Sequence, residues 1–192
     1  MTKKGILFDM DGTLINTYEN INFRQALSEL KTVQKTLILK ILKSRVRSFA
    51  EMETRILQEV EDPAEGKELV RRVSDFLLEH YDNAPLKKDA LMFLQYVKQK
   101  NYKICLCTNN ATEIVSHILR EKHMEAYFDY VITSQQVTRS KPDPQMYLEA
   151  LHNIDLTAEE CIVFEDTENG VMAARNAGID VIVVNDKEKR KY

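Results

Sequence analysis

The sequence predicts an α/β protein with three layers, in which helices cover both faces of a parallel sheet and a further helical segment is inserted after the first strand. Three observations lead to this fold class. Apolar runs of strand length recur along the chain, segments with helical spacing separate the later runs, and the stretch 18–83 shows helical patterns without a convincing strand. At 192 residues the chain can form one main core with a small insertion.

The predicted strands are short apolar runs at residues 5–10, 102–108, 130–134, 161–166 and 180–185. Several of these runs are apolar without alternation, which is typical of strands whose two faces are both covered. Helical spacing is found between the later runs, at residues 87–100, 111–122, 144–153 and 168–177. Gly178 follows the last helix as a typical stop. The alternation of strands and helices predicts a parallel sheet, because parallel strands need crossover connections.

The segment between the first two strands has a different character. Leu27, Leu69 and Leu77 belong to apolar patterns that repeat with helical spacing. We therefore predict a catalytic core formed by residues 1–16 and 84–192, and a helical cap domain formed by residues 17–83. A helical insertion at this position lies over the carboxyl ends of the strands, where such sheets bind ligands. The segment is a candidate lid.

Bulk composition is that of an ordinary globular protein, with 44% hydrophobic and 30% charged residues. The formal charge of -3 gives no overall basic field, so we expect no nucleic-acid partner. The first apolar run is too short for a signal peptide and no later run approaches a membrane span, so we expect a cytoplasmic protein without a membrane partner. Cys105, Cys107 and Cys161 lie in predicted strands, and we expect buried free thiols.

Two carboxylates, Asp9 and Asp11, lie where the first predicted strand ends. Side chains two residues apart on a strand point the same way, and Gly12 permits a tight exit from it. A simple Asp-Gly turn would account for Asp11, but it does not explain Asp9. Neighbouring carboxylates must share a proton or be neutralised by a cation. The pattern therefore predicts either a shared proton or a cation site at this end of the strand.

A second carboxylate pair, Glu165 and Asp166, ends the fourth predicted strand, which lies near the first in a doubly wound sheet. Oxygen ligands without neighbouring His or Cys residues favour Mg²⁺ over zinc. A helix-capping role for Asp166 is the alternative. Because the metal interpretation also accounts for Asp9, we predict a Mg²⁺ cofactor.

Two further segments could bind an anion. Thr108, Asn109 and Asn110 end the second strand directly before a helix, where a hydroxyl and backbone amides form an anion site, although these residues are also ordinary caps. Lys141 lies in the loop 141–144, which two prolines stiffen, ahead of the next helix. Such a loop holds an ammonium group in place better than a surface helix does.

Four segments carry a resemblance to a known family: residues 9–13, 108–110, 141–144 and 165–170. In their order and spacing along the chain they resemble those of the haloacid dehalogenase superfamily, in the branch of β-phosphoglucomutases and small sugar-phosphate phosphatases. The resemblance spans nearly the whole chain and implies a Rossmann-like core with a helical cap after the first strand. It also implies that Asp9 is a nucleophile forming an aspartyl-phosphate and that Asp11 is the general acid and base. The implied Mg²⁺ ligands are Asp9, Asp11 through its backbone carbonyl, Glu165 and Asp166, and the implied phosphate-binding residues are Thr108, Asn109, Asn110 and Lys141.

Asp11 also bears on the type of reaction. Dehalogenases of this superfamily lack the second aspartate, because displacing a halide requires no proton on the leaving group. The presence of Asp11 therefore favours phosphoryl transfer over dehalogenation.

Substrate specificity is expected in the cap. The segment 42–47 resembles the cap loop of β-phosphoglucomutases, and Arg24, Lys43 and Arg47 are candidate substrate contacts. For Lys43, Arg45 and Arg47 the alternative is a solvated helix face. Ser44 replaces the glycine of that loop, and Asn22 stands where mutases carry a histidine. Since asparagine is neither an acid nor a base near neutral pH, hydrolysis is favoured over mutase chemistry.

The sequence thus predicts a Mg²⁺-dependent phosphatase acting on a small phosphate monoester, such as a sugar phosphate or a similar metabolite. A β-phosphoglucomutase-type phosphotransferase is the alternative. A catalytically silent binding module is a third interpretation, which the presence of Asp9, Asp11, Lys141 and Asp166 disfavours. We expect a small phosphorylated metabolite as the partner and a monomer or small homo-oligomer as the assembly.

Overall fold

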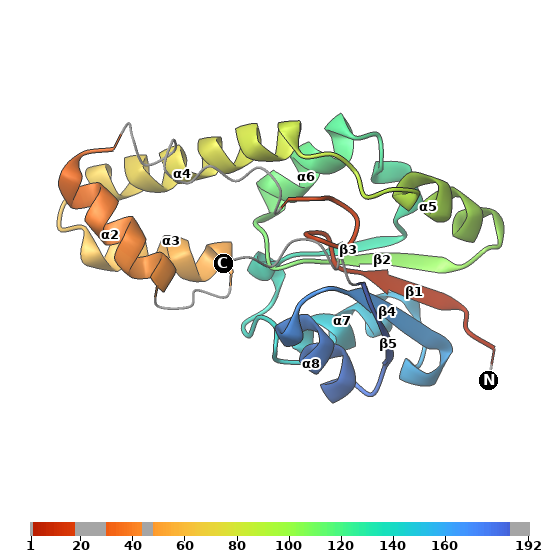
Figure 1. Cartoon of the computed structure of the whole chain (residues 1–192). Helices are drawn as coiled ribbons and strands as arrows, with labels where there is room; N and C mark the ends of the chain where they lie inside the picture. The colour runs from red at the N-terminus through yellow and green to blue at the C-terminus, as the bar shows by residue number, and fades with distance from the viewer. Residues whose placement is uncertain (1, 18–29, 44–47, 185–192) are drawn as a thin grey trace.

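The computed structural model describes residues 2–17, 30–43 and 48–184 (Figure 1). At its centre is a parallel sheet with the strand order β3-β2-β1-β4-β5. The strands are β1 (Gly5–Phe8), β2 (Lys103–Cys107), β3 (Tyr130–Ile132), β4 (Cys161–Glu165) and β5 (Asp180–Val183). Each predicted run contains one strand, which ends one or two residues before the predicted end. Asp9, Thr108 and Asp166 therefore come directly after the ends of β1, β2 and β4.

Helices cover both faces of this sheet, as the sequence predicts. One face carries α5 (Ala90–Gln99) and α6 (Thr112–Glu121), and the other carries α7 (Gln145–Ile154) and α8 (Glu168–Asn176) (Figure 1). Successive strand side chains alternate between the faces, so that Ile6 and Phe8 pack with α5 and α6 while Leu7 packs with α7 and α8. Short 3₁₀ helices lie in the connections, at Glu125–Tyr127, Ser134–Gln136 and Ala158–Glu160. The predicted three-layer α/β fold is confirmed.

All three cysteines lie in the core, on the strand faces that pack against α7 and α8. Cys105, Cys107 and Cys161 are free and fully buried. Burial raises the pKa of Cys105 to about 12 and that of Cys161 to about 11. The expectation of buried free thiols is confirmed.

The strand order fixes where a ligand site can form. The chain adds β2 and β3 on one side of β1 and then crosses to add β4 and β5 on the other side. In such sheets ligands bind beyond the carboxyl ends of the strands, at the point where the order reverses. Phe8 is paired with Phe164, and the N–H of Asp9 donates to the carbonyl of Phe164 at 3.0 Å. Asp9 and Glu165 are therefore neighbours at this point.

The inserted segment is helical in its described part and consists of α2 (Thr32–Lys43), α3 (Phe49–Glu59) and α4 (Pro63–Asn83). It has its own apolar core, formed by Ile38, Ile41, Met52, Ile56 and Leu69. The hydroxyl of Ser48 caps α3 by accepting the N–H of Glu51 at 3.1 Å, and Asp62 followed by Pro63 begins α4. None of the helices in the described ranges is both long enough and apolar enough to cross a membrane.

Helix α4 connects the cap to the core. It runs from the cap toward the sheet, where its carboxyl end lies beside α6 (Figure 1). Tyr81 belongs to the core cluster on the α5 and α6 face, and Leu77 contacts both that cluster and the cap cluster. The division at residues 83 and 84 stays a prediction, and the last turns of α4 pack with the core that follows it.

Candidate active site

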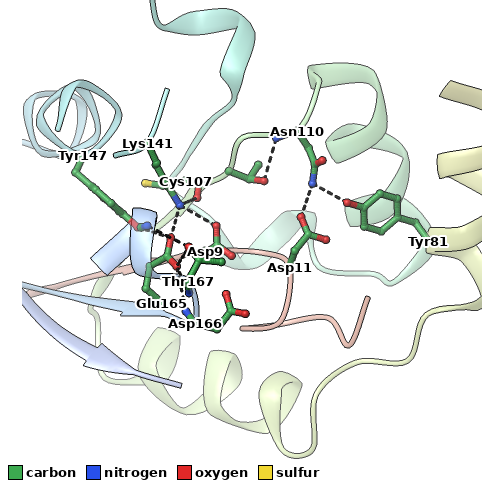
Figure 2. Close-up of polar contacts among 12 residues, drawn as sticks. Asp9, Asp11, Tyr81, Cys107, Asn110, Lys141, Tyr147, Glu165, Asp166 and Thr167 are labelled. Carbon is green, nitrogen blue, oxygen red and sulfur yellow. Dashed lines mark hydrogen bonds and ion pairs between the residues drawn. The ribbon is translucent and has the colours of Figure 1, made fainter. Parts of the chain in front are cut away.

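The carboxyl ends of three neighbouring strands bring the predicted core residues to one edge of the sheet (Figure 2). Asp9 and Asp11 follow β1, the segment 108–110 follows β2, Glu165 ends β4, and Asp166 comes directly after it. Lys141 enters from the loop before α7. From the sequence, the proximity of these residues is inferred only from the expected order of the strands. The structure shows their contacts.

Lys141 lies at the centre of this group and is only 2% exposed. Its Nζ donates to Asp9 Oδ1, to Glu165 Oε1 and to the carbonyl of Cys107, each at 2.7 Å (Figure 2). An ammonium group has three N–H donors, so all three are used. Burial alone would lower the pKa of Lys141, but the carboxylates of Asp9 and Glu165 raise it well above its ordinary value. The ammonium is therefore charged and fixed in direction.

Glu165 is fully buried, and both of its carboxylate oxygens accept hydrogen bonds. Oε1 accepts from Lys141 and from the Tyr147 hydroxyl at 3.2 Å. Oε2 accepts from the backbone N–H groups of Asp166 and Thr167, at 3.0 and 3.1 Å, and from the Thr167 hydroxyl at 3.0 Å. Burial opposes its charge, but Lys141 and the Thr167 donors hold the pKa of Glu165 below its ordinary value. These contacts explain how a buried carboxylate is tolerated here.

Gly170, in the first turn of α8, lies directly against Glu165. A Cβ atom built on Gly170 would overlap the Glu165 carboxylate. We expect Gly170→Ala to displace that carboxylate and lower the melting temperature by about 5 °C or more, since roughly 2 kcal/mol of stability is lost when a buried polar network is broken. Differential scanning calorimetry of the purified variant measures this.

Gly66→Ala is the matched control, because Gly66 also lies near the start of a helix, α4. The nearest atom to a Cβ on Gly66 is Leu57 Cδ2 at 3.3 Å, the end of a flexible side chain. Alanine favours a helix over glycine by about 1 kcal/mol, so the two effects oppose each other and we expect little net change. Equal melting temperatures for the two variants would contradict the packing role of Gly170.

Three buried carboxylates lie close enough to share a metal ion. One oxygen from each of Asp9, Glu165 and Asp166 lies within 4.8 Å of the others. Burial raises the pKa of Asp9 well above its ordinary value, Lys141 opposes this, and the charges of Glu165 and Asp11 add to it. A divalent cation would offset this excess of negative charge. The donor set, made of hard oxygen atoms, fits Mg²⁺.

The two predicted ligands from β4 differ in their surroundings. Glu165 would have to give up hydrogen bonds from its present donors to coordinate an ion. Asp9 and Asp166 fit a metal-binding role more directly, and the role of Glu165 as a metal ligand stays a prediction.

Asp11 is held by a different set of contacts. Its Oδ2 accepts from Asn110 Nδ2 at 2.6 Å, and the same nitrogen lies 2.8 Å from the Tyr81 hydroxyl (Figure 2). Burial raises the pKa of Asp11, while hydrogen bonds with Tyr81 and Asn110 oppose the increase. Asp11 Oδ1 is buried and has no hydrogen-bond partner within the described part of the chain. A carboxyl group with a raised pKa suits proton transfer nearer to neutral pH.

The loop after β2 contacts both the core and the cap. The Thr108 hydroxyl accepts the N–H of Asn110 at 3.2 Å, and the carbonyl of Asn110 accepts the N–H of Ser134 at 3.1 Å. The carbonyl of Asn109 accepts the N–H of Phe49, the first residue of α3, at 3.2 Å. The predicted phosphate-binding segment is thus shaped by both domains, and its binding role stays a prediction.

Sequence reasoning missed Tyr81, Tyr147 and the carbonyl of Cys107. Tyr147 lies in α7 with its ring among the apolar residues below the sheet, so its position in the sequence indicates only a core residue. The predicted cap contacts are not located by the structure: Lys43 is the last residue of α2, and Arg24 and Arg47 lie outside the described residues, as do Asn22 and Ser44.

Comparisons with known proteins agree with this geometry. The chain matches the model of the haloacid dehalogenase-like hydrolase family over residues 6–184. It is 32% identical over 188 residues to a phosphorylated carbohydrates phosphatase from Thermotoga maritima, which covers 93% of this chain and 83% of that protein. It is 28% identical over 186 residues to the pyrophosphatase PpaX of Bacillus mycoides, with 94% and 82% covered.

Among solved structures, CbbY from Rhodobacter sphaeroides in complex with phosphate is similar to this chain. The TM-score is 0.74 at 23% identity, and the alignment covers 98% of this chain and 90% of that chain. This likeness supports the fold. The family match and the curated relatives show that the chain belongs to the haloacid dehalogenase-like hydrolases and is a phosphatase of that family.

Proposed function

We propose that this enzyme is a Mg²⁺-dependent phosphatase that hydrolyses a small phosphate monoester, such as a sugar phosphate, through an aspartyl-phosphate intermediate on Asp9. The observation that carries the proposal is the position of Asp9. Its carboxylate is buried at the strand-order reversal, is paired with Lys141 at 2.7 Å, and lies beside Asp166 and Glu165. A carboxylate held in this way has the surroundings that a nucleophile for phosphorus needs.

The first half of the reaction transfers the phosphoryl group to the enzyme. A carboxylate oxygen of Asp9 forms a bond to phosphorus as the bond from phosphorus to the leaving oxygen breaks, and Asp11 donates a proton to that oxygen. Repulsion between a carboxylate and a phosphate at contact is about 4 kcal/mol for an effective dielectric constant near 20. The charge of Lys141 offsets part of it. Mg²⁺, held by Asp9, Asp166, the carbonyl of Asp11 and Glu165, would neutralise charge on the phosphoryl oxygens.

The second half returns the enzyme to its starting state. Asp11, now ionised, takes a proton from a water molecule as that water attacks phosphorus. The bond between phosphorus and Asp9 breaks, which releases inorganic phosphate and restores the Asp9 carboxylate. The Thr108 hydroxyl and the backbone around Asn109 and Asn110 would hold the phosphoryl oxygens in both halves.

Substrate choice is proposed to lie in the cap. The name of the Thermotoga maritima relative supports a phosphorylated carbohydrate as the substrate class. Basic side chains at Arg24, Lys43 and Arg47 would contact the part of the substrate that lies away from the transferred phosphate.

The first test is metal-dependent phosphate release. We expect the protein to hydrolyse p-nitrophenyl phosphate with Mg²⁺, to lose that activity with excess EDTA, and to regain it when Mg²⁺ is restored. The same assay on a panel of sugar phosphates and pyrophosphate identifies the preferred class. No phosphate release from any panel member with Mg²⁺ would refute the proposal.

The products distinguish hydrolysis from mutase chemistry. With β-glucose 1-phosphate, we expect free phosphate to form faster than glucose 6-phosphate. Conversion to glucose 6-phosphate with little free phosphate, above all after priming with a sugar bisphosphate, would show a mutase instead.

A further inference from the structure

We infer that Tyr81, near the end of helix α4, is a positioning residue that, together with Asn110, orients the acid and base Asp11. This inference rests on the proposed function of Asp11. Helix α4 begins in the cap and ends at the core. The inference gives its last turn a part in the chemistry of the core.

The contacts around the Asn110 amide carry the inference. Its Nδ2 atom lies 2.6 Å from Asp11 Oδ2 and 2.8 Å from the Tyr81 hydroxyl (Figure 2). A side-chain amide nitrogen has two hydrogens, so it can donate to both oxygens at once. Three segments meet at this nitrogen: the loop after β1, the loop after β2 and the carboxyl end of α4.

The position of Tyr81 is itself fixed on both sides. The side chain is 5% exposed and its ring belongs to the core cluster. The preceding residue, His80, places its Nε2 atom 2.8 Å from the carbonyl of Thr17, in the connection from β1. The following residue, Asp82, places Oδ1 2.7 Å from His117 Nε2 on α6. The Tyr81 hydroxyl therefore cannot move away from Asn110 without disturbing contacts to the core.

These contacts hold the two oxygens of Asp11 in different surroundings. Oδ2 is held by Asn110, whereas Oδ1 is buried without a hydrogen-bond partner among the residues that the structure describes. Rotation of the carboxyl group would exchange the two oxygens and spoil the alignment of a proton transfer. By fixing Asn110, the Tyr81 hydroxyl keeps Oδ2 in its hydrogen bond and so holds the carboxyl group in one orientation.

A purely structural role for Tyr81 is the competing explanation, because a buried tyrosine needs some partner for its hydroxyl. Tyr81→Phe separates the two, since it retains the ring and removes only the hydroxyl. The useful measure is kcat/KM, which reports the steps up to loss of the leaving group. An aryl leaving group needs little protonation, whereas an alkyl oxygen needs a proton from Asp11.

We expect Tyr81→Phe to lower kcat/KM about tenfold for the best sugar phosphate and less than about twofold for p-nitrophenyl phosphate, because positioning contributes only part of a general-acid effect of about 10²–10⁴. Asp11→Asn should show a larger loss with the same selectivity. Tyr127→Phe is the control, because the Tyr127 hydroxyl accepts a hydrogen bond from Gln95 away from the site. We expect its kcat/KM to be unchanged for both substrates. Melting temperatures report on folding.

A double variant provides the second measurement. Once Asp11 is replaced, its orientation no longer matters, so adding Tyr81→Phe to Asp11→Asn should cause no further selective loss. An equal loss on both substrates in Tyr81→Phe, or no loss on either, would overturn the inference while leaving the phosphatase activity established. Wild-type protein that releases phosphate from neither substrate would overturn the proposed function and this inference together.

Discussion

Asp9→Asn is expected to reduce phosphate release by about 10³-fold or more, because it removes the nucleophile that must bond to phosphorus. The amide oxygen of asparagine can still accept a hydrogen bond from Lys141, so the lysine keeps a partner at this position. The neutral side chain also removes repulsion with Glu165 and Asp11, the charges that raise the pKa of Asp9. We therefore expect the metal-free variant to melt no more than about 3 °C below the wild type.

The measurement is single-turnover hydrolysis of p-nitrophenyl phosphate with Mg²⁺, together with thermal unfolding in EDTA. Asp75→Asn is the control, because Asp75 is an exposed residue of the cap that pairs only with Arg71 among the described contacts. It should retain wild-type activity. Activity of Asp9→Asn within tenfold of the wild type would exclude Asp9 as the nucleophile.

Lys141→Ala is expected to cost stability as well as activity. The lysine is the partner of two buried carboxylates, Asp9 and Glu165, each at 2.7 Å. Removing one side of a buried ion pair costs about 3–5 kcal/mol, because the remaining charge is left uncompensated. For a protein of this size that corresponds to a fall of roughly 6–20 °C in melting temperature. Unfolding should be followed in EDTA, so that no metal ion replaces the lost charge.

The effect of Lys141→Ala should depend on pH. In the wild type the pKa of Glu165 is held below its ordinary value of 4.5, so its contribution to stability is present above that value and is lost as the pH falls through the folded-state pKa. In the variant the unpaired carboxylate is penalised when charged, so the variant loses stability as the pH rises. The difference between the two proteins should be widest near neutral pH and narrow below about pH 4.

Lys40→Ala is the matched control for this prediction. Lys40 also lies 2.7 Å from a carboxylate, that of Glu59, but both side chains are exposed on the cap. An exposed pair contributes about 0–1 kcal/mol, so its melting temperature should change by about 3 °C at most at any pH. Similar losses for Lys141→Ala and Lys40→Ala would show that the buried pairs do not stabilise the fold.

The parts of the site that the sequence predicts are those determined by local position. Asp9, Thr108 and Glu165 lie at the ends of apolar runs, and parallel strands bring such ends to one edge of a sheet. Lys141 is marked by its proline-rich loop. The apolar runs and the polar residues that follow them are enough to predict that these side chains gather at one edge of the sheet.

The contacts of Tyr81 and Tyr147 could not be predicted in the same way. Each tyrosine lies on a helix at a position that apolar spacing assigns to the core. Whether its hydroxyl reaches Asn110 or Glu165 depends on how that helix packs against the sheet, which no local pattern specifies. The boundary between cap and core is hard to predict for the same reason. The last turns of α4 follow the helical pattern of the cap, but they pack with the core.

The three contacts of Lys141 also restrict how this protein can change over time. Through Asp9, Cys107 and Glu165 the ammonium joins the ends of three adjacent strands, β1, β2 and β4. A descendant that lost the lysine alone would carry two unmatched buried charges and fold poorly, so it would be removed before its catalytic defect mattered. Loss of activity in this lineage should therefore proceed through neutral replacements at both Asp9 and Glu165 first, with position 141 free to change only afterwards.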